Sequence, residues 1–350
     1  MKANFLLAIL FCGYCMGCAS VSVVPEPHSV FYPAPPEEPR LQYLTSFSSS
    51  RDIEGDTGAF SQFVLGEVPE KPIVKPYGVT VDHGRIYVAD TVLNSIEVLD
   101  LNKKSFEYFS PRGGAELRSP TNLGIASDGK MYIADARRGQ VLIFNTNGEY
   151  VSAIGSAGEL KPSDVKIWGG RIFICDLKTQ SVRVYDAKNH DFLFSIPPAT
   201  ETEKEAKVFS PTNIFIDTAG EIYVSDTGGF CVKKYDSGGK LLNTLGLQGD
   251  SPGQFARPKG VAVDREGRVF VVDAAFENVQ IFDTEGKLLL FFPDQEEYKL
   301  VLPAGIAIDY ENISYFKKYI DQDFEVEYLV LVASQYGERK ISVFGFGKKR

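Results

Sequence analysis

From about residue 40 onward, short runs of alternating apolar and polar residues are separated by turns rich in Gly, Asn and Asp. The runs are rich in Val, Ile, Phe and Tyr, which favour β-strands because branched and aromatic side chains pack well on a pleated surface. Each set of runs opens on Pro, crosses a turn and, in most copies, ends its second run on Asp. The pattern predicts a chain made almost entirely of short antiparallel strands.

This set of runs recurs along the chain. The clear copies are Pro76–Asp100, Pro120–Asn145, Pro162–Asp186, Pro211–Asp236 and Pro258–Asp283, and a sixth begins at Pro303–Asp309 and resumes at Tyr328–Gly347. A fourth run follows the third in four copies, at Glu149–Ile154, Phe192–Ile196, Lys240–Leu245 and Lys287–Phe292. Four strands at a period of about 40–50 residues are typical of a β-propeller blade. We therefore predict an all-β fold, a six-bladed β-propeller of four-stranded antiparallel blades.

Ring closure is expected to come from the N-terminal side. Leu41–Phe47 has the character of a fourth strand, whereas no fourth run follows the sixth copy before Arg350. Pairing of this segment with the last blade would remove two sheet edges. The alternative is a separate N-terminal strand packed elsewhere.

The first residues have the features of an export signal. Met1-Lys2 is followed by the apolar run Ala3–Phe11, which is too short to span a bilayer, and then by Gly17-Cys18. This resembles a bacterial lipoprotein signal, which would be cleaved before Cys18 and leave that residue lipidated. Ala19 in place of Asp then implies the outer membrane, facing the periplasm, rather than the inner one. An ordinary secretory signal is the alternative.

Residues 18–39 contain six prolines and predict an extended, semi-rigid tether. A disordered tail without a spacing role is equally compatible with this composition. The expected organisation is a signal peptide at 1–17, a lipidated tether at 18–39 and one propeller domain at 40–350.

The repeats resemble those of the NHL family of six-bladed propellers, and in particular its bacterial lipoprotein members. The resemblance rests on the Pro-x-Gly/Asn opening, on second strands such as Ile86–Asp90 (IYVAD) and on third strands ending in Phe, Tyr or Leu before Asp or Asn. Phe63–Glu67 also resembles those lipoproteins. The family's Asn-His-Leu is nowhere intact, and Asn94-Ser95-Ile96 is the nearest match.

Composition narrows the possible partners. The chain has 37 Lys and Arg against 46 Asp and Glu, a net charge of −9, which argues against nucleic acid because phosphate binding needs a cationic surface. Cys175 and Cys231 are the only cysteines after Cys18. Cys175 replaces Ala or Ser of other copies, so we expect two small buried thiols rather than a disulfide. We expect a monomeric propeller.

Candidate chemistry is sparse. The repeated Asp at the end of each second strand is expected to accept backbone N–H bonds. Of the three histidines, His28 lies in the tether, and His83 and His190 lie in turns on the face opposite the one where propeller lyases and lactonases work. Two residues after each Pro, Asn122, Asp164 and Asn213 should converge on the channel mouth. This arc of oxygens could bind Ca²⁺ or a small polar ligand, or could form turn hydrogen bonds only.

Basic residues gather in the turns and connections predicted for the top face, where second strands turn into third strands and one blade leads to the next. The candidate binding residues are Arg118, Arg137, Arg138, Lys161, Lys178, Arg257, Lys259 and Arg339. Such a surface suits an anionic partner. The alternative is that exposed turns collect charge by chance.

The insertion Asn312–Glu325 in the sixth copy places apolar residues at helical spacing and predicts a short amphipathic helix, packed on its own blade or docking a partner. Together these features predict a lipid-anchored, non-catalytic binding scaffold of the cell envelope, for an anionic protein or cell-wall partner. The alternatives are a metal-dependent lyase or lactonase-like enzyme at the channel mouth and a structural envelope lipoprotein. We expect no cofactor, with Ca²⁺ as the exception to test.

Overall fold

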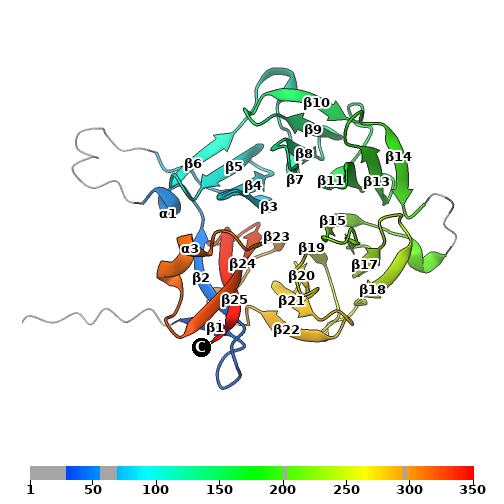
Figure 1. The fold of residues 1–350 in the computed structure, drawn as a ribbon. Helices are drawn as coiled ribbons and strands as arrows, with labels where there is room; N and C mark the ends of the chain where they lie inside the picture. Colours follow the sequence, from blue (N-terminus) through cyan, green and yellow to red (C-terminus); the bar gives the residue numbers. More distant parts are fainter. Residues whose placement is uncertain (1–28, 56–68, 199, 201–202, 295–297) are drawn as a thin grey trace, which may run out of the picture.

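The computed structural model describes residues 29–55, 69–198, 200, 203–294 and 298–350. Within these ranges the chain forms six antiparallel sheets arranged as a ring, which confirms the predicted six-bladed propeller (Figure 1). The predicted signal peptide, Cys18, His28 and Phe63–Glu67 lie outside the described residues.

The blades follow one another along the chain. Blade one is β3 (Pro76–Asp82), β4 (Arg85–Asp90), β5 (Ser95–Asp100) and β6 (Ser105–Phe109). Blade two is β7 (Pro120–Ile125), β8 (Met131–Asp135), β9 (Gln140–Phe144) and β10 (Tyr150–Ile154). Blade three is β11 (Pro162–Trp168), β12 (Arg171–Asp176), β13 (Ser181–Asp186) and β14 (Phe192–Ile196). Blade four is β15 (Pro211–Ile216), β16 (Ile222–Asp226), β17 (Cys231–Tyr235) and β18 (Leu241–Leu245).

Blade five is β19 (Pro258–Val263), β20 (Val269–Asp273), β21 (Asn278–Phe282) and β22 (Leu288–Phe292). Blade six is β23 (Pro303–Asp309), β24 (Phe324–Ser334), β25 (Ile341–Lys349), β2 (Leu41–Phe47) and β1 (Val30–Tyr32). The short helices are α1 (Arg51–Glu54), η1 (Gly113–Ala115), η2 (Lys204–Ala206), α3 (Ile313–Phe316) and η4 (Lys317–Tyr319).

The core is divided among the blade interfaces. Six clusters of buried apolar side chains each join two neighbouring sheets around the ring. Each buried Val, Leu, Ile or Phe contributes about 1.5–3 kcal/mol relative to an exposed one. The alternation of apolar residues along the strands therefore stabilises the contacts between blades as well as each blade.

The repeated aspartates have the structural role that the sequence predicts. Asp135 is fully buried and accepts the backbone N–H groups of Arg118, Ser119 and Arg138 at 2.6, 3.1 and 2.9 Å. Asp90, Asp176, Asp226 and Asp273 are equally buried and accept equivalent bonds. Each carboxylate thus fixes a second-to-third-strand turn against the connection that enters the same blade.

Ring closure occurs as predicted, because β2 pairs antiparallel with β25 and becomes the fourth strand of blade six. The structure adds a fifth strand, β1, which pairs with Leu41–Tyr43. Tyr32 is fully buried against Phe292 and Phe344. Part of the segment predicted as tether therefore belongs to the folded body, because its aromatic side chains cover the outer edge of blade six.

The insertion of blade six is less helical than predicted. It contains only the single turns α3 and η4, and Phe324 already belongs to β24. Phe316 packs on Phe47 at a centroid distance of 6.1 Å, and Gln42 bonds to the backbone of Tyr319 and Asp321 at 2.9 and 3.0 Å. Packing on its own blade, rather than helix propensity, therefore determines this segment.

Cys175 and Cys231 are free and buried, as predicted. In the described ranges, no helix combines the length and the apolar character that a membrane crossing requires.

Candidate functional site

The channel residues predicted to converge do so. Asn122, Asp164 and Asn213 line one cavity of about 160 Å³ enclosed by the innermost strands. Gly78, Gly260 and Gly305 hold the equivalent positions of the other blades and allow close backbone approach. A Cβ on Gly305 would lie only 2.5 Å from the carbonyl oxygen of Tyr77. The channel is therefore narrow on the glycine side and polar on the other.

The protein itself satisfies the one charged residue of this arc. Asp164 accepts the backbone N–H of Val165 at 2.7 Å and of Ile214 at 3.0 Å, and its carboxylate lies 3.1 Å from the Lys166 ammonium. Burial raises the pKa of Asp164, and Lys166 opposes that shift. Both carboxylate oxygens are already engaged, so a cation would have to displace Lys166.

Asn213 provides an oxygen with different properties. Its Oδ1 is buried and lacks a hydrogen-bond partner among the described residues. The described residues also contain no group of three or more His, Cys, Asp or Glu arranged to hold a metal ion. An uncharged acceptor without a partner suits an N–H or O–H donor better than Ca²⁺, which prefers several carboxylate oxygens. The donor set thus fits a small polar ligand or water better than a metal.

Lys259 and Tyr77 meet at the level above the cavity. They come from blades five and one, and the Lys259 Nζ lies 5.8 Å from the Tyr77 ring centroid. The strand between them has the small Ala304 at this position, which leaves room for both side chains. Burial, with a contribution from Arg257, lowers the pKa of Lys259 to about 8. Lys259, which the sequence predicted as an exposed binding residue, is instead 91% buried.

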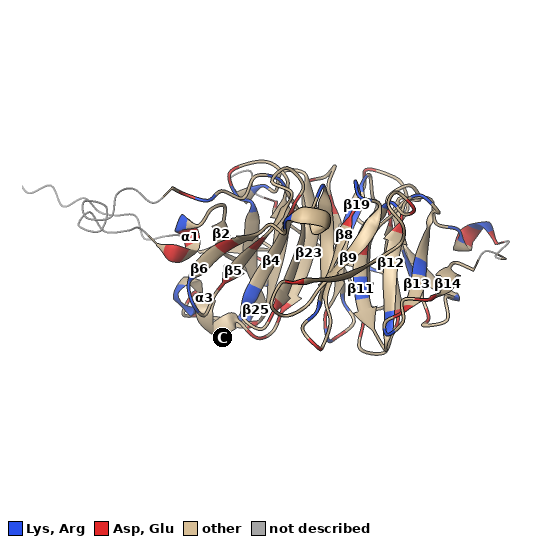
Figure 2. Cartoon of the chain, turned by 90° about the horizontal axis from the view of Figure 1, so that it is seen from above, with Lys and Arg blue, Asp and Glu red and all other residues tan. Residues whose placement is uncertain are grey.

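The turns and connections predicted for the top face lie side by side in each of the blades compared. The turns that follow the second strands lie beside the connections between blades, as the bonds from Thr91 N to Lys75 O (3.2 Å) and from Ala136 N to Ser119 O (3.0 Å) show. In the edge-on view of Figure 2, charged residues concentrate in the turns at both faces, and the strands between them are mostly uncharged. The charged side chains are therefore concentrated on two separate faces.

The predicted cations of the top face divide into two groups. Arg118, Arg137, Lys161 and Arg257 are exposed, and none has a side-chain partner among the described residues. Arg138 instead donates to the carbonyls of Glu116 and Gly114 at 2.9 Å, and Lys178 donates to Gly158 O at 2.8 Å. Arg339 lies over the Tyr298 ring at 5.1 Å. The second group therefore supports the fold, and the first group is available to a partner.

The top face also carries apolar side chains that the sequence analysis did not single out. Among the described residues, the exposed large apolar side chains outside the strands lie in its turns and connections, and they are Val92, Leu93, Phe209, Leu247 and Tyr336. Phe209 is 46% exposed and Leu247 is 60% exposed. Their position in otherwise polar turns was a signal present in the sequence. Exposed aromatic and aliphatic residues next to Arg are the usual composition of a protein-binding surface.

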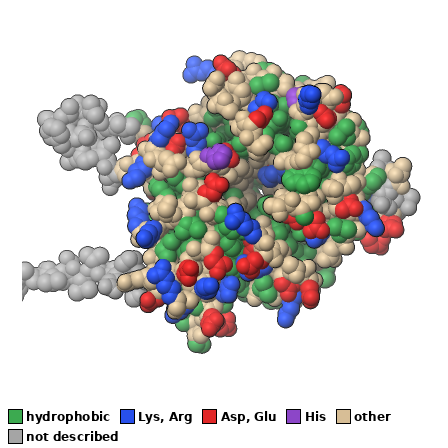
Figure 3. Space-filling model, in the orientation of Figure 1, with side chains coloured by type: hydrophobic (Ala, Val, Ile, Leu, Met, Phe, Trp, Pro, Cys, Tyr) green, Lys and Arg blue, Asp and Glu red, His purple; other side chains and the backbone are tan. Residues whose placement is uncertain are grey.

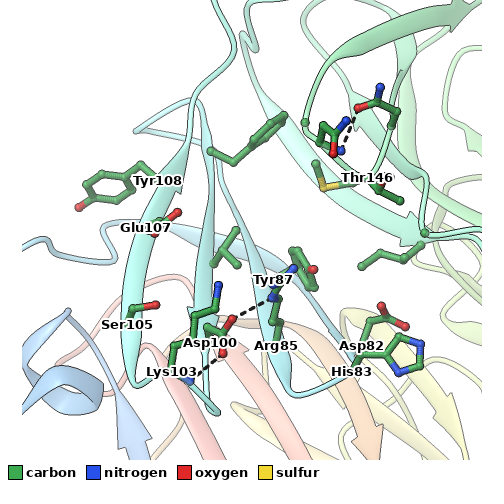
Figure 4. Close-up of a pocket in the computed structure, with 18 residues that line it drawn as sticks. Asp82, His83, Arg85, Tyr87, Asp100, Lys103, Ser105, Glu107, Tyr108 and Thr146 are labelled. Atoms are coloured by element: carbon green, nitrogen blue, oxygen red, sulfur yellow. Dashed lines mark hydrogen bonds and ion pairs between the residues drawn. The ribbon is translucent and has the colours of Figure 1, made fainter.

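The bottom face differs from the top face because it carries two histidines and a groove. His83 and His190 lie in its turns, as predicted, and Figure 3 shows this face, with both histidines in purple and a hollow near its centre. A cavity of about 540 Å³ also opens here, as a groove between blades one and two. Figure 4 shows Asp82 and His83 at one end of the groove and Glu107 at the other. Nothing in the sequence analysis predicted this groove.

Comparison with known proteins supports the fold only. No family model and no curated protein sequence matches the chain. Among solved structures, the chain is similar to a streptogramin B lyase, with a TM-score of 0.54 and 13% identity over 79% of this chain and 95% of that one. A Bacteroides thetaiotaomicron protein of unknown function has a TM-score of 0.59 and 13% identity, covering 87% and 75% of the two chains. An auxiliary nutrient binding protein from the same organism has a TM-score of 0.58 and 10% identity, covering 78% and 69%.

Proposed function

We propose that this protein is a lipid-anchored, non-catalytic binding propeller of the bacterial cell envelope, whose top face docks an anionic partner. The observation that carries the proposal is the coincidence of two kinds of exposed residue on that face. Cations without partners (Arg118, Arg137, Lys161 and Arg257) share it with the apolar turn residues Val92, Leu93, Phe209, Leu247 and Tyr336. Chance accumulation of charge in turns does not account for the apolar residues.

The charged and the apolar residues of this face have different roles in binding. Arginines at the rim attract and orient carboxylate or phosphate groups on the partner. The apolar residues supply the buried area that stabilises the complex. The partner is thus an acidic envelope protein or an anionic cell-wall polymer, presented to a propeller held at the outer membrane through Cys18. A nutrient-binding propeller among the structural neighbours is consistent with a binding function.

The test is capture of partners from native membranes by the full-length lipoprotein, using the double variant Arg118→Glu/Arg137→Glu. Both residues are exposed, so folding should be unchanged, and capture should fall at least tenfold. The control is Lys317→Glu/Lys318→Glu, which reverses the same number of charges on η4 at the bottom of blade six. Loss of capture with the control but not with the top-face variant would contradict the proposal.

The anchoring part is tested separately. Cys18→Ser should prevent lipidation and move the protein from the detergent phase to the aqueous phase. A mutant that still fractionates as a mature membrane lipoprotein would show that the signal is interpreted wrongly.

A lyase or lactonase-like enzyme at the channel mouth is the weaker candidate. A lyase is among the neighbours, but its identity with this chain is only 13%. The single carboxylate of the arc, Asp164, is already bonded to Lys166 and to two backbone N–H groups. We therefore propose no resident metal. Binding of stoichiometric Ca²⁺ to the purified protein, measured by titration calorimetry, would reverse this preference.

A further inference from the structure

The groove between blades one and two lies on the opposite face from the proposed docking surface. Its floor consists of the outer three strands of blade one, and its far wall consists of the turns around Gly129 and Asn145–Gly148 of blade two. A volume of about 540 Å³ is within the usual range of small-molecule sites, about 300–1,000 Å³. The groove is therefore large enough for a ligand and is built by well-ordered strands on one side.

The other blades show why this groove is open. In blade one the floor row across the strands is Tyr87, Val98 and Glu107, and in blade four the same row is Tyr223, Lys234 and Asn243. Lys234 lies 5.3 Å from the Tyr223 ring centroid and 2.5 Å from the Glu221 carboxylate. That side chain fills the blade four–five groove, which measures about 170 Å³. The shorter Val98 leaves the corresponding space of blade one unfilled.

Two other interfaces are filled by apolar packing. Between blades two and three, Tyr132, Ile143 and Ile167 belong to one cluster. Between blades three and four, Trp168 and Phe194 take this role. The blade five–six interface keeps a cavity of about 310 Å³, lined among others by Ile281, Leu290 and Phe346. The open space therefore varies from one interface to the next, and the blade one–two groove is larger than those of blades four–five and five–six.

The groove offers an aromatic face and hydrogen-bonding groups together. Arg85 is held 3.0 Å from Asp100 and lies beside Tyr87, so the guanidinium is positioned before any ligand arrives (Figure 4). Phe109 adds a second aromatic wall. Asp82, Lys103 and Glu107 make no side-chain hydrogen bond or ion pair among the described residues, although the charge of Lys103 acts on Asp100. These polar groups are free to bond a ligand.

The charges of the lining nearly balance. Asp82, Asp100 and Glu107 oppose Arg85 and Lys103, so the groove has no strong field of either sign. Such a lining favours an uncharged ligand with many hydroxyl groups over an anion or a cation. A sugar ring has this chemistry, because its C–H face stacks on an aromatic ring and its hydroxyls bond carboxylates, amides and ammonium groups. We propose that the blade one–two groove binds a short, uncharged oligosaccharide.

The experiment is calorimetric titration of the intact protein with cellotriose, chitotriose and maltotriose, and with a tripeptide and a galacturonate trimer as non-matching probes. At least one neutral trisaccharide should bind with a Kd below about 1 mM. Val98→Lys places the filling side chain of blade four into this groove, opposite Glu107, and should weaken binding at least tenfold. Lys234→Val makes the reverse change in the other groove and should leave this affinity unchanged.

A second variant covers the case in which Val98→Lys does not fold. Glu107 is exposed, so Glu107→Ala should keep the melting temperature of the parent and still weaken binding several-fold. Absence of binding by all three neutral trisaccharides, preference for the tripeptide or the galacturonate trimer, or affinity that is unaffected by both groove variants would overturn the proposal. Loss of partner capture by the top-face variant would not affect this result, so the two proposals can fail independently.

Discussion

The blade one–two region and the blade four–five region are two copies of the same structural unit with different contents. Both have a Tyr on the second strand at the floor of the groove, and both have a Gly-containing turn from the next blade as the wall. In the second region Lys234 and Glu221 form an ion pair inside the groove, and about 170 Å³ remains. In the first region Val98 stands in the place of Lys234, Arg85 turns to Asp100, and about 540 Å³ remains.

The difference shows where a propeller can acquire a site without loss of stability. The buried aspartates lie away from the floor of the groove, and the floor side chains Tyr87 and Val98 are only partly buried at the margin of the blade one–two cluster. A change of side chain at that floor therefore alters the cavity more than it alters the scaffold. Both regions belong to one closed ring, so opening the ring should affect both, whereas a change in one groove should affect only that groove.

The largest effect should come from opening the ring. Deletion of Leu41–Phe47 removes the buried side chains of Leu41, Leu44 and Phe47 and leaves β25 unpaired on its outer side. Since each large-to-small change in a core costs about 2–5 kcal/mol, the loss should exceed about 5 kcal/mol. Circular dichroism should show a sharply lower melting temperature or no cooperative transition. Leu242→Ala, in an exposed outer strand, is the control, and an unchanged, monomeric transition in the deletion variant would mean that the ring closes by another route.

The next largest effect should come from removing one buried aspartate in each of the two regions. Asp135→Ala and Asp273→Ala each leave several backbone N–H groups without their buried acceptor. We expect a loss of about 3 kcal/mol for each variant, measured by denaturant unfolding. Asp186→Ala removes similar bonds in an exposed turn and should cost less than about 1 kcal/mol. Clearly unequal losses at Asp135 and Asp273 would show that the two regions do not share one scaffold.

The third effect is specific to blade one, and here the substitution should increase stability instead of lowering it. Glu97 is fully buried, and burial, together with the charge of Asp90, raises its pKa from 4.5 to about 9. Its Oε2 has no partner among the described residues, whereas Lys233, at the same position of blade four, donates to Glu205 O. Between these two pKa values the unfolded chain releases the proton and the folded chain keeps it, so stability falls as pH rises through this window.

Glu97→Gln removes this titration while keeping the shape of the side chain. It should stabilise the protein at pH 7 by up to roughly 3 kcal/mol, with little effect near pH 4. Thermal melts between pH 4 and 9 measure the effect, and Lys233→Gln is the matched control without that pH profile. A stability difference between Glu97→Gln and the parent that does not grow with pH would mean that Glu97 is ionised in the fold.

The smallest effect concerns the ion pair that fills the second groove. Lys234→Val should lower stability by less than about 1 kcal/mol, because both partners are only partly buried. Denaturant unfolding measures this loss, and Val98→Lys should be similarly mild because Val98 is only partly buried. A loss of several kcal/mol in either variant would show that the groove floor is part of the core.

Much of the architecture follows from repetition in the sequence. The Pro opening, the strand pattern and the Asp of each second strand predicted the blades, the ring and the role of Asp135 correctly, because these features depend on pairing within one repeat. The sequence also predicted that Asn122, Asp164 and Asn213 share a cavity, since equivalent residues of a ring face its axis. The predicted tether extended too far, because β1 is stabilised by strand pairing with blade six and by packing of Tyr32 on blades five and six, which lie far away in the sequence.

The candidate sites could be predicted less well from the sequence. Charge counting found the top-face cations but could not distinguish Arg137, which is exposed, from Arg138, which bonds backbone carbonyls. It also placed Lys259 on the surface, although Lys259 is buried beside Tyr77 because Ala304 leaves room between them. Such distinctions depend on neighbours that lie far away in the sequence.

The sequence by itself determined the strand order, the number of blades and the buried aspartates, because local pattern and repetition encode them directly. Only the tertiary structure decided which charged residues are free, how Asp164 is neutralised by Lys166, and that the space beside Val98 is open. The physical reason is that burial and cavity volume are properties of side chains brought together from different blades. Val98 by itself does not predict a groove; the groove exists because the turns of the next blade leave Val98 uncovered.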